Sequence, residues 1–140
     1  MTCSTWSAGL CPLRIQYDPD AIRKLHRKAG TRAVSGVLYG RLDADTLRIE
    51  SLRLVPGNSS NAVWAKLASA KPKGLVAVGF FSVRERIALT DSDVMRLRCQ
   101  FPARWQTALI LNPGGRAGFF VRSHDGTLDA ARSPAEFDLY

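Results

Sequence analysis

The sequence predicts an α/β domain in which a curved, mixed β-sheet is flanked by about three helices. The chain has 140 residues, of which 46% are hydrophobic, and this is the size of one compact domain with one core. Strand-like and helix-like segments alternate along it, which is the pattern of an α/β fold. The run at residues 75–81 is continuously apolar, as expected of a central strand that is covered on both faces.

The first helix is expected at residues 19–29. Asp18 followed by Pro19 is typical of a helix start, because aspartate caps the free N–H groups and proline at the first position needs none. Apolar side chains then recur at spacings of three and four, which predicts one buried face. Gly30 stands where a helix ends. A short alternating strand is expected before this helix, at residues 13–17.

The chain is expected to divide into a short N-terminal tail and one domain. We expect a poorly ordered tail at residues 1–12 and one folded domain over residues 13–140. The opening MTCSTWSAGLCPL lacks the basic start and long apolar centre of a signal peptide, and no run of about 18 apolar residues follows for a membrane span. A cytoplasmic protein without membrane association is the expectation.

Two strands are expected next, at residues 33–39 and 46–55, joined by a turn that contains aspartates. The apolar phase of the second strand changes after Ile49. An extra residue in the strand would produce this change, so we predict a β-bulge near Glu50 and Ser51.

A short helix, capped by Ser60 or Asn61, should run to about residue 70 and lead into the central strand. Within that strand, Gly79 would let a neighbouring backbone approach closely.

Thr90 and Asp93 have the spacing of a capping box and predict a third helix at residues 91–101. Three further strands are expected at residues 105–111, 117–122 and 135–139.

The charge and the cysteines narrow the function classes. The net charge of +8 is typical of a solvated basic surface, and no helix-turn-helix or aromatic-interleaved basic motif accompanies it, so nucleic-acid binding is kept only as a third hypothesis. Cys3, Cys11 and Cys99 are odd in number and lack metal-type spacing, which favours neither a disulfide framework nor a zinc knuckle. Cys99 is expected to be a buried thiol. No cofactor is predicted.

Residues 75–93, LVAVGFFSVRERIALTDSD, carry a more specific signal. They resemble the stretch His-x-His-Pro, then Ser or Thr, then x-x-Asp, of the JAMM/MPN family of zinc isopeptidases. AVSGVLYG at residues 33–40 is similar to the family's Glu-x-x-Gly-x-Leu-x-Gly. The resemblance implies an MPN-like domain with its site between the central strand and the next helix.

Most of the family's metal-binding residues are replaced. Ser82 and Arg84 stand at the two histidine positions and Glu85 at the proline position, while Thr90 and Asp93 are retained. A serine hydroxyl is a poor zinc ligand, and a protonated guanidinium has no lone pair to donate. One carboxylate cannot hold a catalytic zinc, which normally takes three protein ligands. We therefore predict no metal.

The general base expected from the resemblance is also replaced. Ala33 occupies the glutamate position, and alanine cannot move a proton. The resemblance then implies a catalytically inactive MPN-like domain that acts as a binding or assembly module, with a protein partner or a second copy. Trp6 or Trp64, if exposed, could contribute to such a contact.

An enzyme with altered chemistry is the alternative function. Ser82 would be its nucleophile, Arg84 an anion clamp, and Glu85 or Asp93 an acid–base partner, but neither an activating base nor an oxyanion hole is identifiable. Metal analysis and a hydrolase screen would separate the two functions. We also predict that Arg84 pairs with Asp93, so that a guanidinium supplies the positive charge that a metal would otherwise supply.

Overall fold

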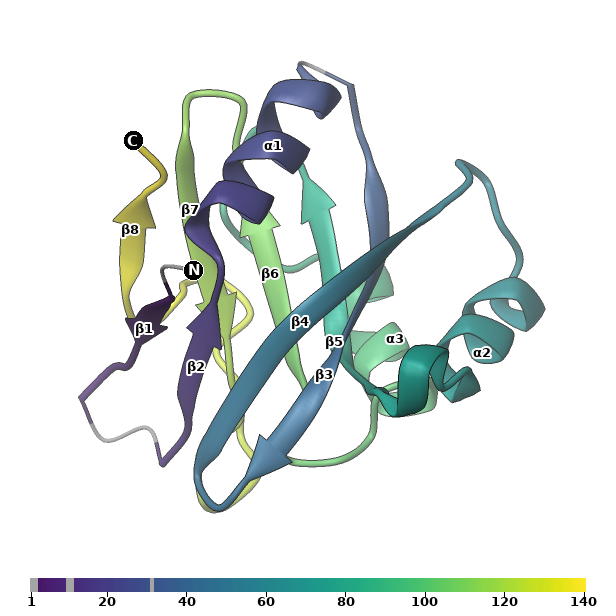
Figure 1. Cartoon of the computed structure of the whole chain (residues 1–140), viewed down its shortest axis with the longest axis vertical. Coiled ribbons are helices and arrows are strands. Elements are labelled where there is room, and N and C mark those ends of the chain that lie inside the picture. Colours follow the sequence, from purple (N-terminus) through teal and green to yellow (C-terminus); the bar gives the residue numbers. More distant parts are fainter. Residues whose placement is uncertain (1–2, 10–11, 31) are drawn as a thin grey trace.

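A curled, mixed β-sheet of eight strands lies at the centre of the computed structural model, with three α-helices packed on its faces (Figure 1). The structure describes residues 3–9, 12–30 and 32–140. The strands are β1 (Ser4–Trp6), β2 (Arg14–Tyr17), β3 (Ser35–Asp43), β4 (Thr46–Val55), β5 (Val76–Val83), β6 (Thr107–Leu111), β7 (Arg116–Phe120) and β8 (Glu136–Asp138). The helices are α1 (Pro19–Ala29), α2 (Asn61–Ser69) and α3 (Asp91–Cys99), with a short 3₁₀ turn at Pro72–Gly74. The predicted fold class, an α/β domain on a curved mixed sheet, is confirmed.

The strand order is β1-β2-β4-β3-β5-β6-β7-β8, and it includes two parallel pairs, β2 with β4 and β5 with β6. The curl brings the two edge strands, β1 and β8, side by side (Figure 1). Trp6 of β1 donates its indole N–H to the carbonyl oxygen of Ala135, at 2.8 Å, and its ring packs against that of Phe119, with centroids 5.4 Å apart. The opposite ends of the chain thus meet around one aromatic cluster.

This contact corrects the expectation of a poorly ordered tail at residues 1–12. Ser4–Trp6 forms a strand that pairs antiparallel with β2, and Trp6 is only 5% exposed. The sequence pattern did not indicate a strand, because three residues are too few to show alternation and the stabilising contacts come from residues more than 100 positions away. Residues 1–2 and 10–11 of the expected tail lie outside the described residues.

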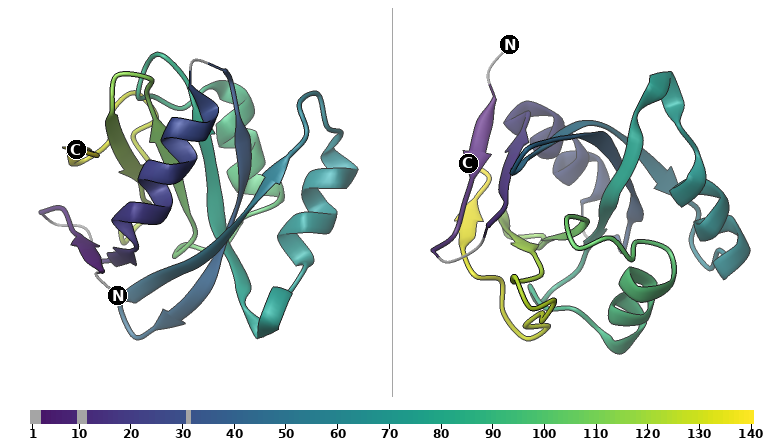
Figure 2. Two further views of the ribbon diagram at one scale, coloured as in Figure 1. Left: turned by 45° about the horizontal axis from the view of Figure 1, so that its top comes forward. Right: turned by 90° about the horizontal axis from the view of Figure 1, so that it is seen from below.

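The helices are divided between the two faces of the sheet, and each face has its own core. α1 covers one face with Ile22 and Leu25, while α2 and α3 cover the other with Trp64 and Leu97 (Figure 2). The central strand β5 is almost entirely buried, as its apolar run predicted.

Several local predictions are confirmed in detail. α1 has the predicted bounds, with Asp18 as its N-cap and Gly30 at its end. In the β3–β4 pair, Tyr39 faces Ser51 and Gly40 faces Ile49, so Glu50 is the extra residue of a bulge.

Gly79 also behaves as predicted. A side chain at Gly79 would collide with the backbone of Thr107 on β6, so only glycine allows these two strands to pair this closely.

The C-terminal end of α3 is fixed by Arg122, which follows β7. Its guanidinium donates to the carbonyl oxygens of Leu97 (3.1 Å) and Phe101 (2.9 Å), and also to that of Ala103. The Leu97 carbonyl belongs to the last turn of α3, where a helix end leaves carbonyls without intrahelical partners, and those of Phe101 and Ala103 belong to the segment that follows the helix. Cys99, in the last turn, is exposed, so the expectation of a buried thiol is wrong.

The described part of the chain includes no helix with the length and apolar character needed to cross a membrane.

Candidate functional site

The candidate site lies where β5 ends and α3 begins, the place that the sequence indicated. Ser82, in the penultimate position of β5, faces Ser35 at the start of β3, and their hydroxyl oxygens are 2.7 Å apart. Ser82 is 4% exposed, and its strand is paired on both sides, with β3 and with β6. Sheet pairing therefore joins two hydroxyls that are 47 positions apart in the chain.

Arg84 and Asp93 form the predicted ion pair. Arg84 Nη2 donates to Asp93 Oδ1 at 3.1 Å, and Arg84 Nη1 donates to Asp93 Oδ2 and, at 3.1 Å, to the carbonyl oxygen of Ala88. The pair is bidentate, the geometry in which a planar guanidinium matches a carboxylate best. The Asp93 side chain is 3% exposed and that of Arg84 is 23% exposed, so the carboxylate is buried and the guanidinium covers it.

Asp93 is also the third residue of α3 and completes a capping box with Thr90. Thr90 N donates to Asp93 Oδ2 at 2.8 Å, and Asp93 N donates to Thr90 Oγ1 at 3.2 Å. Burial raises the pKa of Asp93, but the hydrogen bonds from Arg84 and Thr90 and the charge of Arg84 outweigh burial and hold the pKa below its ordinary value. The carboxylate is therefore ionised at neutral pH, and both of its oxygens accept hydrogen bonds.

A second guanidinium, that of Arg96, stands beside the same carboxylate. Arg96 Nη1 lies 3.7 Å from Asp93 Oδ1, and Arg96 Cζ lies 4.0 Å from the ring centroid of Trp64, a cation–π contact that orients the side chain. Burial lowers the pKa of Arg96; the charge of Asp93 raises it and that of Arg84 lowers it, and the net shift is downward. Arg96 Nε is buried without a hydrogen-bond partner among the described residues.

A cavity of about 210 Å³ opens next to this cluster. Arg96 and Trp64 form its wall on the helix side, and Ala33 and Ser35 form its wall on the sheet side. The loop that follows β4 closes it with Pro56, Gly57, Asn58 and Ser59. The cavity is smaller than the roughly 300–1,000 Å³ of typical drug-sized ligand pockets, so it suits a small group.

The structure brings together most of the residues that the sequence singled out. Arg84, Thr90 and Asp93 are in direct contact, Ser82 is bonded to Ser35, and Ala33 lines the neighbouring cavity. Glu85 is exposed on the turn after Arg84.

The donor set of this cluster does not fit a catalytic zinc. Both oxygens of Asp93 accept hydrogen bonds from Arg84, and Ser82 offers a hydroxyl that is engaged with Ser35. Within the described residues, no three His, Cys, Asp or Glu side chains gather closely enough to hold a metal ion.

Two residues of the site were missed from the sequence. The sequence motifs do not single out Arg96, although its position three residues after Asp93 places both side chains on one face of the helix and could have indicated their contact. Ser35 gave no local signal, because its partnership with Ser82 depends on strand pairing.

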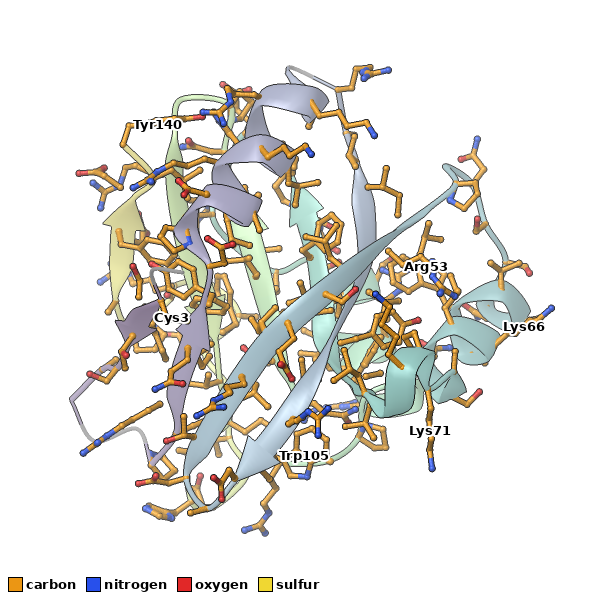
Figure 3. All side chains as sticks on the ribbon, in the orientation of Figure 1. Cys3, Arg53, Lys66, Lys71, Trp105 and Tyr140 are labelled. Atoms are coloured by element: carbon orange, nitrogen blue, oxygen red, sulfur yellow. The ribbon has the colours of Figure 1, made fainter. Side chains whose placement is uncertain are left out.

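The two tryptophans proposed for a partner contact are not exposed. Trp6 is 5% exposed and Trp64 is 4% exposed, because each fills one of the two cores. The condition set for their contribution, exposure to solvent, is therefore not met, and an assembly surface would have to use other side chains. The basic side chains Lys66 and Lys71, in contrast, point outward from α2 and the segment that follows it (Figure 3).

Comparison with known proteins identifies the fold. No protein-family model matches the chain, and no curated protein matches it. Solved structures do match: the chain is similar to the solution structure of a protein from Salinibacter ruber (strain DSM 13855), a structural genomics target, with a TM-score of 0.53. The likeness covers 84% of this chain and 88% of that one at 12% sequence identity. At this identity the likeness is one of fold.

Proposed function

We propose that this chain is an MPN-like domain related to the JAMM zinc isopeptidases, in which a salt bridge has replaced the metal centre. In this proposal it acts as a catalytically inactive binding or assembly module in the cytoplasm. The observation that carries the proposal is the bidentate pair of Arg84 with the buried carboxylate of Asp93. A guanidinium held against that carboxylate supplies positive charge without a site for activating water.

The hydrolase alternative is weaker because, among the described residues, the hydrogen-bond partner of the Ser82 hydroxyl is another serine. Its hydroxyl is bonded to Ser35 Oγ, and a second serine hydroxyl cannot act as the general base that a serine nucleophile needs. Ser82 is also buried, at 4% exposure, which leaves little access for a substrate.

Restoring the family's residues provides a direct test of the proposed relationship. Two side chains at positions i and i+2 at the end of a strand point to the same side, so histidines at 82 and 84 would face Asp93. The variant Ala33→Glu/Ser82→His/Arg84→His should gain about one equivalent of zinc by elemental analysis after dialysis, whereas the parent chain should retain none.

The same measurement contains its control. Adding Asp93→Ala to the restored variant should abolish zinc retention, since the site would lose its carboxylate ligand. A folded restored variant that retains no zinc would argue against an MPN-type site. Stoichiometric zinc in the parent chain would overturn the proposed replacement of the metal.

The binding or assembly role is tested separately. Sedimentation velocity of the purified chain over a range of concentrations should reveal self-association if a second copy is the partner. Salt-sensitive retention on DNA or RNA would instead favour the nucleic-acid hypothesis.

A further inference from the structure

We infer that the cavity beside Arg96 binds a small oxyanion, a carboxylate or a phosphate, through the Arg96 guanidinium and the Ser35 hydroxyl. The inference rests on the proposed function in one respect: it assigns a ligand class to a pocket that binds rather than hydrolyses. Where the zinc isopeptidases bind a cation, this chain would bind an anion beside the corresponding position.

The charges of the cluster leave a positive excess. Arg84 and Arg96 carry two positive charges, and Asp93 carries one negative charge. Arg84 takes both oxygens of Asp93 in hydrogen bonds, whereas Arg96 approaches Oδ1 only to 3.7 Å, beyond hydrogen-bond distance. The charge of Arg96 is therefore only partly compensated in a setting where its side chain is 20% exposed. An anion in the cavity would complete that compensation.

The donors of Arg96 are also unused. A guanidinium carries five N–H groups in a planar fork. Among the described residues none accepts a hydrogen bond from the Arg96 side chain, and its Nε is fully buried without a partner. A half-buried arginine ordinarily binds carbonyls or carboxylates, as Arg122 does with three carbonyl oxygens in this same structure. The open N–H groups of Arg96 fit an oxyanion ligand.

Ser35 can supply a second donor. The Ser35–Ser82 contact needs only one of the two hydroxyl protons. Ser82 is buried, so if it donates to Ser35, the Ser35 proton is left to point into the cavity that Ser35 lines. A donor on the sheet wall and a guanidinium on the helix wall would then face one ligand from two sides.

The cavity also limits the size of the ligand. Its volume of about 210 Å³ corresponds to about seven water molecules, each of which occupies roughly 30 Å³ in the liquid. Trp64 stacks on the guanidinium and keeps it from swinging outward, so the binding group is held in place before a ligand arrives. These features select a small planar or tetrahedral anion.

The inference is tested by NMR titration of the full chain with sodium phosphate and, separately, with sodium acetate, each against sodium chloride at matched ionic strength. Saturable shifts are expected for the backbone amides of Ser35, Gly57 and Asn58 with at least one of the two anions. A larger response to phosphate would identify a tetrahedral ligand, and a larger response to acetate a planar carboxylate; either supports the inference.

Matched variants assign the binding to this cavity. Arg96→Gln should weaken the anion by about tenfold or more, as expected for loss of a charge-assisted hydrogen bond. Arg98→Gln removes the same charge from an exposed position on the opposite side of α3 and should leave the affinity unchanged. If Arg96→Gln does not fold, Ser35→Ala serves as the second variant and should weaken binding several-fold.

Two results would overturn the inference. The first is the absence of a saturable shift with either anion. The second is an anion affinity of the variant, Arg96→Gln or its replacement Ser35→Ala, that equals that of the wild type. Failure here is distinguishable from failure of the proposed function. A chain that retains no zinc and binds no anion contradicts only the anion site, whereas a chain that retains one zinc contradicts the salt-bridge replacement itself.

Discussion

The guanidinium of Arg84 binds both carboxylate oxygens of Asp93 and thereby joins the end of β5 to the first turn of α3. The same carboxylate accepts a hydrogen bond from the backbone N–H of Thr90. One buried charge therefore caps α3 and also links the two ends of the turn between β5 and α3. Removing either partner would leave the other charge without its main counterpart in a largely buried setting.

Arg84→Ala should lower the free energy of unfolding by about 3 kcal/mol, because it leaves the Asp93 carboxylate buried and underpaired. Asp93→Ala should destabilise by a similar amount, since it also removes half of the capping box. The double variant should be more stable than the sum of the two losses predicts, by about 1–3 kcal/mol. Urea unfolding of the four proteins measures this coupling.

Arg86 provides the control for that cycle. It is exposed in the same turn, so Arg86→Ala should change the free energy of unfolding by no more than about 0.5 kcal/mol. Strict additivity of the Arg84 and Asp93 variants would contradict an energetically important pair.

Stability should fall in acid because of Asp93. Its pKa is held below the ordinary value of 3.8, despite burial, by its hydrogen bonds and by Arg84, so the folded state favours the ionised form. The contribution is present above about pH 4 and is lost as the pH falls from 3.8 through the folded pKa. Asp93→Asn removes this titration, so the stability difference between wild type and variant should shrink with acidification. Urea midpoints measured as a function of pH test this; a constant difference would contradict it.

Arg122→Lys should destabilise the protein by about 1–3 kcal/mol. A lysine ammonium cannot reach all three carbonyl oxygens that the planar guanidinium contacts in the last turn of α3 and the segment after it, and a buried acceptor that loses a hydrogen bond is unfavourable. Thermal unfolding followed by circular dichroism measures the loss. The matched change Arg104→Lys, at an exposed arginine that donates to one carbonyl, should have an effect of less than about 0.5 kcal/mol.

Trp6→Ala should destabilise the protein by about 3–5 kcal/mol, the range for deleting a large buried aromatic side chain. Trp6→Phe keeps a ring against Phe119 but loses the hydrogen bond to the Ala135 carbonyl, so it should have a smaller effect. Urea unfolding of both variants tests whether the contact between the edge strands stabilises the domain. If Trp6→Ala unfolds with the same free energy as the wild type, β1 contributes little to the stability of the domain.

Local signals in the sequence predicted much of the fold. The bounds of α1, the Thr90–Asp93 capping box and the bulge at Glu50 follow from side chains within a few positions of one another, because capping and strand phase are local effects. The Arg84–Asp93 pair also followed from the sequence, since a family resemblance placed both residues around one point.

Contacts between distant segments could not be predicted in the same way. β1 is held by Trp6 against Ala135 and Phe119, and a three-residue strand has no periodicity of its own. Cys99 was expected in the core because cysteine is usually buried, but the helix face on which it lies is turned to solvent.

The sequence by itself determined the α/β class, most of the helices and strands, and the presence of Ser82 and Arg84, which are not zinc-binding residue types, around the end of β5, because these depend on composition, periodicity and local chemistry. Only the tertiary structure decided that Ser82 bonds to Ser35 and that Trp6 and Trp64 are buried. It also decided that Arg96 stands with open N–H groups beside a small cavity. The physical reason is that strand pairing and helix packing set which distant side chains meet, and burial then fixes their exposure and charge balance.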